Sequence, residues 1–423
     1  MPFGIELICT KFSDKRMKNN ISRRNFILLG GTLSTGALID FKDKGFLGDM
    51  GENRQLNVGV IGTGSRGTWI IKVIKDIPGI NVTACCDVQE ANLNRALGFS
   101  GKGAKGYSDY RELLDDQEIK AVVIATPLYL HCQLALDALM AGKHIYCEKT
   151  MTYDIPEAIH LAKKVNQSKL IFQVGYQQRA NPLFHKIHSF ISNGYCGTVT
   201  HIACHWNRNG DWRRPVADPK LERLVNWRMY REYSGGLMAE LCSHQIDVVN
   251  WMLGSHPEKV TGFGGVNFWK DGRDTFDNVH AVFEYPEGVK AQFTALTTNA
   301  HEGFSMKFYG TKATIEVNRE DGQQAFIFPE PNKWNSEQGM DGVTGATQSV
   351  YEPGVGIPIK MDQAQNDLFY TGNAFKSFLE SVRTNRQPAA NVNSGKESAI
   401  SVHMANLALR NGTIEHWKKE YSG

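Results

Sequence analysis

The stretch GVIGTGSRG, residues 59–67, decides the fold of the first part of this chain. Its glycines Gly62, Gly64 and Gly67 have the G-x-G-x-x-G spacing of a dinucleotide-binding turn between a strand and a helix. The first glycine permits the tight turn, the second lets the backbone approach a pyrophosphate, and the third lets the helix pack on the strand. The helix N-terminus then presents free N–H groups and a positive dipole to the phosphates.

A second apolar run, INVTACCD, ends at Asp87, 20 residues after Gly67. An acid at this distance accepts hydrogen bonds from a ribose 2′-hydroxyl. Because a carboxylate also repels a 2′-phosphate, the sequence predicts NAD as the cofactor rather than NADP. Arg66 is the residue that would soften this repulsion. The alternative interpretation is a glycine turn in an unrelated α/β protein.

The composition excludes several classes of partner. Of the 423 residues, 41% are hydrophobic and 22% are charged, as in a globular protein of about two to three domains. No apolar run is long enough to span a bilayer, so we expect no stable membrane anchor. The formal net charge is +3, and no cluster of lysine and arginine suggests a nucleic-acid partner.

The N-terminus resembles an export signal. Arg23 and Arg24 precede the modest apolar stretch FILLGGTLSTGALI, residues 26–39, which is too short to cross a membrane. We expect residues 1–40 to be a twin-arginine signal, 41–55 to be a linker or arm, and the protein to be periplasmic. The alternative is a short amphipathic start of the chain.

The rest of the chain has two parts with different patterns. From Leu56 to Gly175, short apolar strands alternate with helical periods, which predicts a Rossmann domain with a doubly wound parallel sheet over 56–175. From 176 to 423, alternating strands separated by turn residues predict an α/β domain with an open-faced, mostly antiparallel sheet and C-terminal helices. A helix from Gly236 to Leu253 interrupts these strands.

Two pairs of residues are candidates for chemistry. Glu148 and Lys149 follow the apolar strand HIYC at the carboxyl edge of the predicted sheet, where ligands bind in open α/β sheets. Lys149 would polarise a substrate oxygen there; the alternative is a surface ion pair. Glu240 and His244 lie four residues apart on one helix face, so the carboxylate would orient the imidazole as a general base. The alternative is a solvated pair.

No metal site is expected. The segment HIACHW contains His201, Cys204 and His205. In a strand, the two histidines would share one face and the cysteine would lie on the other, so the spacing does not fit a zinc site.

Four motifs together resemble the glucose–fructose oxidoreductase / inositol dehydrogenase (Gfo/Idh/MocA) superfamily. They are ATP at 125–127, EK at 148–149, GYQQR at 175–179 and GGLMAELCSHQID at 235–247, within a resemblance that runs from Leu56 to Asn411. The resemblance implies a Rossmann domain joined to an open-faced α/β domain, homodimers or homotetramers formed through the open sheet, and oxidation of a sugar or polyol with NAD(P).

The resemblance also implies roles for individual residues. The family's active lysine matches Lys149, and its carboxylate–histidine pair matches Glu240 and His244. Two positions depart from the family pattern: Thr150 stands where proline is usual, and Glu240 stands where aspartate is usual.

These motifs give the set of site residues that we expect. The expected catalytic residues are Lys149, His244, Glu240 and Tyr176. The expected cofactor-binding residues are Gly62, Gly64, Ser65, Arg66, Gly67, Asp87, Thr126, Pro127, His131, Glu148, Lys149 and Gln177. The expected substrate-binding residues are Arg179, His205, Trp206, Arg208, Arg228, Tyr233 and His244.

Three functions remain open from the sequence. The first is NAD-dependent oxidation of a carbohydrate hydroxyl at ring C3, with His244 as base and Lys149 stabilising the alkoxide. The second is an NAD-dependent glycosidase that oxidises C3 transiently, eliminates the leaving group and reduces C3 again, with Glu240 or Tyr176 as an added acid or base. The third is a non-catalytic dinucleotide- or sugar-binding protein, which would need none of these residues.

Overall fold

The computed structural model of the protein describes residues 55–216, 218–318, 324–330, 355–361 and 366–422. The predicted export signal, 1–40, and nearly all of the predicted linker, 41–55, lie outside the described residues. Within the described part, no helix is long and apolar enough to cross a membrane. The seven cysteines found there are all buried and free.

The first six strands form one parallel sheet in the order β3-β2-β1-β4-β5-β6. The strands are β1 (Leu56–Ile61), β2 (Ile80–Cys86), β3 (Lys105–Tyr107), β4 (Ala121–Ile124), β5 (His144–Cys147) and β6 (Phe172–Val174). The strand order reverses between β1 and β4, so the loops after these two strands diverge and leave a crevice for a ligand. The predicted doubly wound parallel sheet is confirmed.

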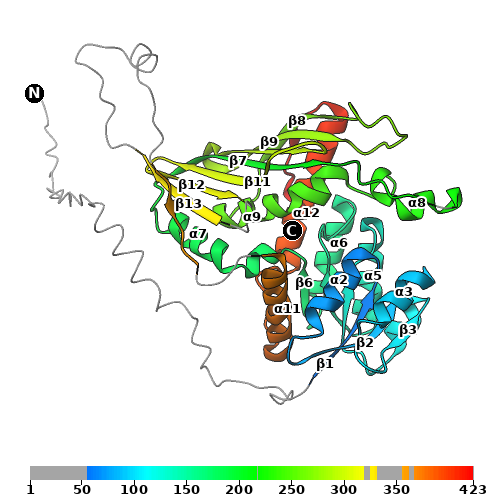
Figure 1. The fold of residues 1–423 in the computed structure, drawn as a ribbon. Helices are drawn as coiled ribbons and strands as arrows, with labels where there is room; N and C mark the ends of the chain where they lie inside the picture. The colour runs from blue at the N-terminus through cyan, green and yellow to red at the C-terminus, as the bar shows by residue number, and fades with distance from the viewer. Residues whose placement is uncertain (1–54, 217, 319–323, 331–354, 362–365, 423) are drawn as a thin grey trace, which may run out of the picture. The chain divides into compact units, whose positions relative to one another are not determined.

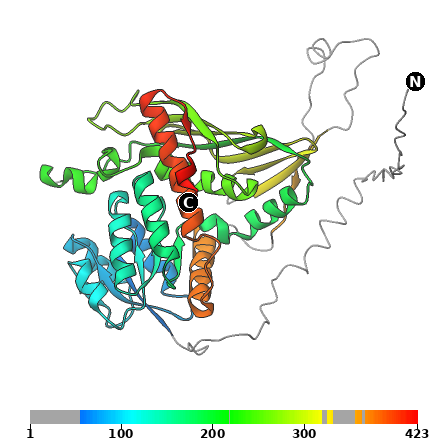
Figure 2. The same ribbon diagram turned by 180° about the vertical axis from the view of Figure 1, so that it is seen from behind.

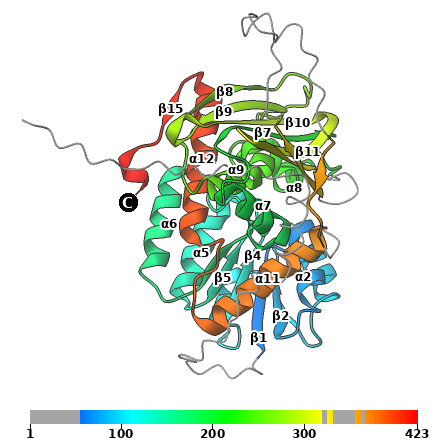
Figure 3. The same cartoon turned by 90° about the vertical axis from the view of Figure 1, so that its left-hand side faces the viewer.

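Helices connect these strands and cover the sheet (Figures 1 and 3). They are α2 (Ser65–Ile74), α3 (Glu90–Leu97), α4 (Tyr110–Asp115), α5 (His131–Met140) and α6 (Ile155–Asn166). All four residues of β4 are buried, as expected for a parallel strand that is covered on both faces.

The second sheet has nine strands in the order β14-β13-β12-β11-β7-β10-β9-β8-β15. The strands are β7 (Val199–Asn209), β8 (Lys259–Gly265), β9 (Asn278–Glu284), β10 (Lys290–Leu296), β11 (Thr298–Gly310), β12 (Ala313–Asn318), β13 (Gln324–Pro329), β14 (Ile357–Pro358) and β15 (Glu415–His416). Within the described strands, β10 and β7 pair in parallel and the remaining pairs are antiparallel. The predicted mostly antiparallel sheet is confirmed.

One face of this second sheet is covered and the other is open. Along β9, Val279, Ala281 and Phe283 are buried, whereas His280 and Val282 are exposed. This alternation is typical of an antiparallel sheet that packs on a core with one face. The covered face lies on helices α9 (Ser243–Leu253) and α12 (Val392–Asn411).

The helical segment that carries His244 contains an irregular turn. Residues 236–253 are helical throughout, as predicted, but Met238–Cys242 form a π-helical segment, η6, ahead of α9. Single π turns inside helices occur frequently at functional sites. Here the turn sets the direction of the Glu240 side chain.

The helix α11 (Asp367–Thr384) returns from the second sheet to the first domain. Phe375, Phe378 and Leu379 belong to the same buried cluster as the residues of β1 and β2. The Phe375 ring stacks on Tyr146 of β5 with centroids 4.1 Å apart. Figure 2 shows α11 (orange) beside the Rossmann layer and α12 (red) continuing to the second sheet. The predicted division at residue 175 places α11 in the second domain, whereas its apolar face completes the core of the first.

Replacement of Phe375 by alanine should destabilise the protein. The change leaves a cavity against Tyr146, and truncation of a buried phenylalanine costs about 3–5 kcal/mol. Urea unfolding followed by circular dichroism measures the change. Leu368→Ala on the same helix is the control, because Leu368 is 60% exposed. Equal stability of the two variants would contradict the role of α11 in this core.

Candidate active site

The glycine-rich turn after β1 is shaped to receive a dinucleotide. Gly62 has φ 85°, in the left-handed region that favours glycine. A Cβ at Gly67 would lie 2.0 Å from the Gly62 carbonyl oxygen, so the close approach of α2 to the turn requires glycine there. A Cβ at Gly64 would meet nothing within 4 Å. The turn therefore leaves open space in front of Gly64 and Ser65, the first residue of α2. A pyrophosphate in this space would accept hydrogen bonds from the free backbone N–H groups at the start of the helix.

Asp87 is fixed beside this turn. Its Oδ2 accepts hydrogen bonds from the backbone N–H of Thr63 at 2.8 Å and from the Thr63 hydroxyl at 3.3 Å. Its Oδ1 accepts from the backbone N–H of Gln89 at 2.8 Å. The carboxylate is thus held where the ribose of a dinucleotide would lie.

Arg66 has a partner that the sequence did not predict. Its Nε and a terminal nitrogen contact Glu148 Oε1 at 2.8 and 2.7 Å. The Glu148 side chain is buried, and the Arg66 guanidinium also lies 4.8 Å from the centre of the Trp69 ring. The structure therefore assigns Arg66 to linking α2 with the end of β5, rather than to softening the repulsion between Asp87 and a 2′-phosphate.

Lys149, Glu240 and Arg228 form a buried charge cluster. Lys149 Nζ donates to the Glu240 carbonyl oxygen at 2.8 Å and lies 4.0 Å from Glu240 Oε2. Arg228 Nε donates to the same Oε2 at 2.8 Å. The side chains of Lys149 and Glu240 are only 13% and 12% exposed. The predicted substrate-binding residue Arg228 is thus a direct partner of the predicted catalytic carboxylate.

The pKa values of the cluster follow from burial and from the neighbouring charges. Burial lowers the pKa of Lys149 and is opposed by the carboxylates of Glu240 and Glu148. Burial raises the pKa of Glu240, but the charges of Arg228 and Lys149 outweigh it, so the net pKa of Glu240 is lowered. Glu240 therefore stays ionised, and Lys149 loses its proton more readily than a surface lysine.

His244 lies in the first turn of α9, four residues after Glu240. Of residues 241–250, all of which the structure describes, His244 is the one that is not fully buried. Its ring lies edge-on to Tyr176, with centroids 6.2 Å apart, and tilted against Trp206 at 5.4 Å. The predicted pairing with Glu240 is revised, because the Glu240 carboxylate leaves the π turn toward Arg228 and Lys149.

The predicted acid–base role of Tyr176 is not supported. Tyr176 is 2% exposed, and burial raises the pKa of its hydroxyl well above the usual value. A phenol in such surroundings keeps its proton. The Tyr176 ring instead fixes the orientation of His244.

Arg179 was predicted to bind substrate, and the structure places it in a buried ion pair. Its Nε donates to Asp247 Oδ2 at 2.8 Å and to Oδ1 at 3.1 Å. The Asp247 side chain is fully buried and also accepts from Ser398 Oγ at 2.9 Å. The prediction was wrong because Asp247, which the sequence presents as a polar position on a helix, points into the protein and takes up the guanidinium.

The neighbours His205 and Trp206 on β7 point to opposite faces of the second sheet. Trp206 lies on the covered face against His244, with Phe304 edge-on at 5.0 Å. His205 therefore lies on the open face, where its ring Nε2 is 3.7 Å from Glu302 Oε2. The predicted substrate contact of His205 is wrong for this reason. Arg208 is exposed at the end of the strand, 5.9 Å from the Trp206 ring centre.

The loop after β4 brings together other predicted residues. Thr126 and Pro127 follow the strand at its carboxyl end, where Tyr129 then lies 5.1 Å, centroid to centroid, from the predicted substrate residue Tyr233. His131 is buried between the carbonyl oxygens of Thr126 and Thr150, at 3.0 and 2.8 Å from its ring nitrogens.

His131 therefore supports the two loops, and its predicted contact with a cofactor is wrong. Gln177 is also buried, at 6% exposure, in the short helix η3 (Gln177–Ala180) that follows Tyr176.

Sequence reasoning missed four residues with structural roles in the site: Thr63, Tyr129, Asp247 and Ser398. Asp247 lies in a helix between the apolar residues Ile246 and Val248. A polar residue among the apolar residues of a helix indicates that its side chain is buried and has a polar partner, and this pattern could have revealed the contact.

Two family models match the chain. Residues 56–176 match a model described as "Oxidoreductase family, NAD-binding Rossmann fold". Residues 184–316 match one described as "GFO/IDH/MocA C-terminal domain". Together the two matches cover more than half of the chain, and they place the glycine turn, Asp87 and Lys149 in the NAD-binding part.

The chain is also similar to individual known proteins and to solved structures. An uncharacterized oxidoreductase, YrbE, of Bacillus subtilis is 30% identical over 211 residues, which are 50% of this chain and 58% of YrbE. The 2,7-anhydro-N-acetylneuraminate hydratase of Escherichia coli is 26% identical over 270 residues, 63% of this chain and 68% of the hydratase. A levoglucosan dehydrogenase solved with NADH and L-sorbose superimposes with a TM-score of 0.70 at 18% identity, over 86% of this chain and 100% of that one. The last likeness concerns the fold.

Replacement of Asp87 by alanine should weaken the preference for NADH over NADPH. A hydrogen bond to a charged group contributes about 1.5–3 kcal/mol, so NADH should bind about 10- to 100-fold more weakly. NADPH should bind equally well or better, because the negative charge is gone. Fluorescence titration gives both Kd values, and Glu90→Ala at the exposed start of α3 is the control. An unchanged ratio of the two Kd values would show that Asp87 does not face the ribose.

Proposed function

The chain belongs to the GFO/IDH/MocA oxidoreductase family, and we propose that it oxidises a carbohydrate hydroxyl, at ring C3, with NAD⁺. The observation that carries this proposal is the cluster of Lys149, Glu240 and Arg228, with Lys149 and Glu240 nearly buried, at the carboxyl edge of the Rossmann sheet. His244 follows Glu240 by four residues on the same helical segment. A protein that only binds dinucleotide or sugar has no need to bury these charges, because their desolvation costs several kcal/mol per ion.

The residues present fit NAD. The open space at Gly64 and the uncapped first turn of α2 would receive the pyrophosphate, and Asp87 would accept the ribose hydroxyls. When bound, NAD⁺ accepts the hydrogen and the electron pair that leave the substrate carbon. The chain itself supplies orientation, charge and proton transfer.

His244 and Lys149 divide the remaining chemistry. The His244 imidazole takes the proton from the substrate hydroxyl, and the rings of Tyr176 and Trp206 hold it in place. The Lys149 ammonium, fixed by the Glu240 carbonyl, stabilises the negative charge that develops on the substrate oxygen. Because the site is largely closed to water, this charge interaction is stronger than it would be in solvent. Arg208 and Tyr233 remain as candidates to bind the sugar.

The variants Lys149→Ala and His244→Ala should lose turnover while they keep the affinity for NADH. Loss of a positioned acid or base costs about 10²–10⁴-fold in rate. Stopped-flow or steady-state assays with a panel of sugars measure the rate, and fluorescence titration measures NADH binding. His201→Ala, on the exposed part of β7, is the matched control.

Two outcomes would contradict this assignment. Near-normal turnover by either variant would remove the role proposed for that residue. A wild-type chain that binds NADH and sugars but converts none of them would favour the non-catalytic binding protein.

A second candidate function uses the same residues for transient oxidation. Similarity to a hydratase over 63% of the chain favours it. Oxidation at C3 would acidify the C2 proton, elimination would release the leaving group, and reduction would restore C3. Incubation in deuterium oxide separates the two functions: this alternative gives exchange at C2 without net NADH, whereas a dehydrogenase accumulates keto sugar and NADH in equal amounts.

We also propose a location and an assembly for the protein. The pair Arg23–Arg24 before an apolar stretch supports twin-arginine export of residues 1–40 to the periplasm. The described cysteines are free and buried, which suits a chain that folds around its cofactor before export. Exposed Phe263, Val282 and Tyr309 on the open sheet face support a homodimer or homotetramer formed through that face.

Exchange of Arg23 and Arg24 for lysine should keep the protein in the cytoplasm. Only the paired arginines are read by the export route, so positive charge alone does not suffice. Cell fractionation with immunoblotting measures the distribution. The double variant Lys42→Arg, Lys44→Arg is the control, because it also exchanges lysine and arginine at two positions but lies outside the predicted signal. Unchanged export would contradict the proposed signal.

A further inference from the structure

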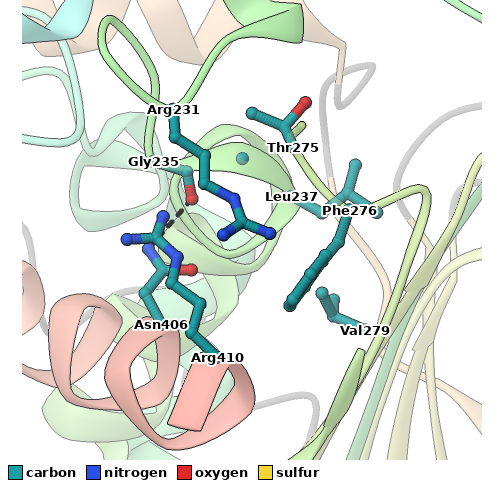
Figure 4. A pocket seen from close by; sticks show the side chains of 9 residues that line it. Arg231, Gly235, Leu237, Thr275, Phe276, Val279, Asn406 and Arg410 are labelled. Carbon is teal, nitrogen blue, oxygen red and sulfur yellow. Dashed lines mark hydrogen bonds between the residues drawn. The ribbon is translucent and has the colours of Figure 1, made fainter. Parts of the chain in front are cut away.

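Two arginine side chains face each other outside the proposed active site. Arg231 and Arg410 line a small pocket together with Thr275, Phe276 and Asn406. Figure 4 shows the two guanidinium groups turned toward one another across this pocket. Arg410 comes from the end of α12, and Arg231 comes from the loop before η6.

The two arginines differ in how they are held. Arg231 donates from Nε to the Asp274 carbonyl oxygen at 2.5 Å, and its guanidinium lies 5.0 Å from the centre of the Phe276 ring. Arg410 is exposed, and among the described residues it makes neither a hydrogen bond nor an ion pair by distance. The titratable groups that act on it electrostatically are Arg231, Tyr153 and Asp274.

Arg231 and Arg410 line the same pocket and carry like charges, which repel one another. Partial burial and the charge of Arg231 lower the pKa of Arg410, with Tyr153 and Asp274 acting in the opposite direction. Guanidinium groups are forks of N–H donors that match carboxylate and phosphate oxygens. An anion between them would remove the repulsion and use donors that are now free.

A larger cavity adjoins the small pocket at Arg410. It has a volume of about 410 Å³ and shares Gly235, Asn406 and Arg410 with the small pocket. The rest of its lining combines apolar and aromatic side chains with the polar or charged residues Asp154, Ser234, His403, Lys418 and Glu420. The apolar and aromatic walls are formed by Ile155, Pro156, Ile159, Leu407, Tyr153 and Tyr421. This volume is in the range of small-molecule sites, whose walls are mainly apolar with a few polar groups.

The acidic side chains of the cavity do not block an anion at Arg410. Asp154 accepts the backbone N–H of Glu157 at 2.8 Å and thereby caps α6. Glu420 is exposed beside Lys418, which brings a further positive charge to the lining.

We propose that this cavity binds a small organic anion, a carboxylate or a phosphate monoester. Its anionic group lies against Arg410 with Arg231 behind it, and its body lies on Tyr153 and Leu407. Neither Lys149 nor His244 lines the cavity, so the site is separate from the proposed reaction centre and does not depend on the proposed function.

The test uses the full chain saturated with NADH, so that the added anions cannot bind at the glycine-rich turn that would hold the pyrophosphate. Inorganic phosphate, glucose 6-phosphate and gluconate are titrated at constant ionic strength, with glucose as the uncharged control. A ligand that binds only the folded state raises the Tm by an amount that grows with the logarithm of its concentration above the Kd, and calorimetry gives the Kd. We expect at least one organic anion to bind more tightly than phosphate through Arg410, and any effect of glucose, which could also enter the proposed sugar site, to be the same in the wild type and in Arg410→Gln.

The variant Arg410→Gln should weaken this binding at least tenfold. Without ligand its Tm should be equal to or higher than that of the wild type, because a like-charge contact is removed. Lys419→Gln removes a positive charge from the same exposed segment without touching the cavity and should leave binding unchanged.

Three results would overturn the proposal. They are equal binding by wild type and Arg410→Gln, equal weakening by Lys419→Gln, and no shift with any anion. A lower Tm of ligand-free Arg410→Gln would show instead that Arg410 serves the fold.

Discussion

The hydrogen bond from Lys149 to the Glu240 carbonyl holds the active site together. It joins residues 91 positions apart at 2.8 Å and ties the end of β5 to the π turn of η6. The next residue repeats the connection, because the Thr150 hydroxyl donates to the adjacent Ala239 carbonyl at 3.1 Å. Consecutive residues of one loop thus bind consecutive carbonyls of the other, and proline at position 150 could not make the second bond. Of the two departures from the family pattern, Thr150 acts here through its side chain, whereas Glu240 takes part through its main-chain carbonyl.

Burial of Lys149 and Glu240 costs free energy. A lysine and a glutamate that are both nearly closed to solvent lose hydration energy, which only close partners recover. Arg228 supplies the second positive charge, so the cluster carries two cations against Glu240, while Glu148 is paired with Arg66. The surplus positive charge suits a site where an alkoxide develops, because the negative charge appears only as the reaction proceeds.

The sequence predicted the backbone better than the partners of side chains. Glycine spacing and apolar periodicity are local, and they gave both sheets and the helix over 236–253 correctly. Partner choice depends on residues far apart in the sequence. Arg179 pairs with Asp247, and His205 follows the strand alternation to the open face, neither of which the spacing of motifs reveals. The position of α11 on the Rossmann core was hidden for the same reason.

One ion pair also connects the cofactor turn with the catalytic lysine. Arg66 lies on the first turn of α2, and Glu148 precedes Lys149 directly, so their contact at 2.7 Å places the dinucleotide turn and the lysine in one rigid unit. Gly175 completes this unit, since a Cβ there would lie 3.0 Å from Glu148 Oε2 and would displace the carboxylate. A shift of α2 on cofactor binding would therefore act on Glu148 and through it on Lys149. The ion pair thus joins the turn that would hold the pyrophosphate to the residue that precedes Lys149.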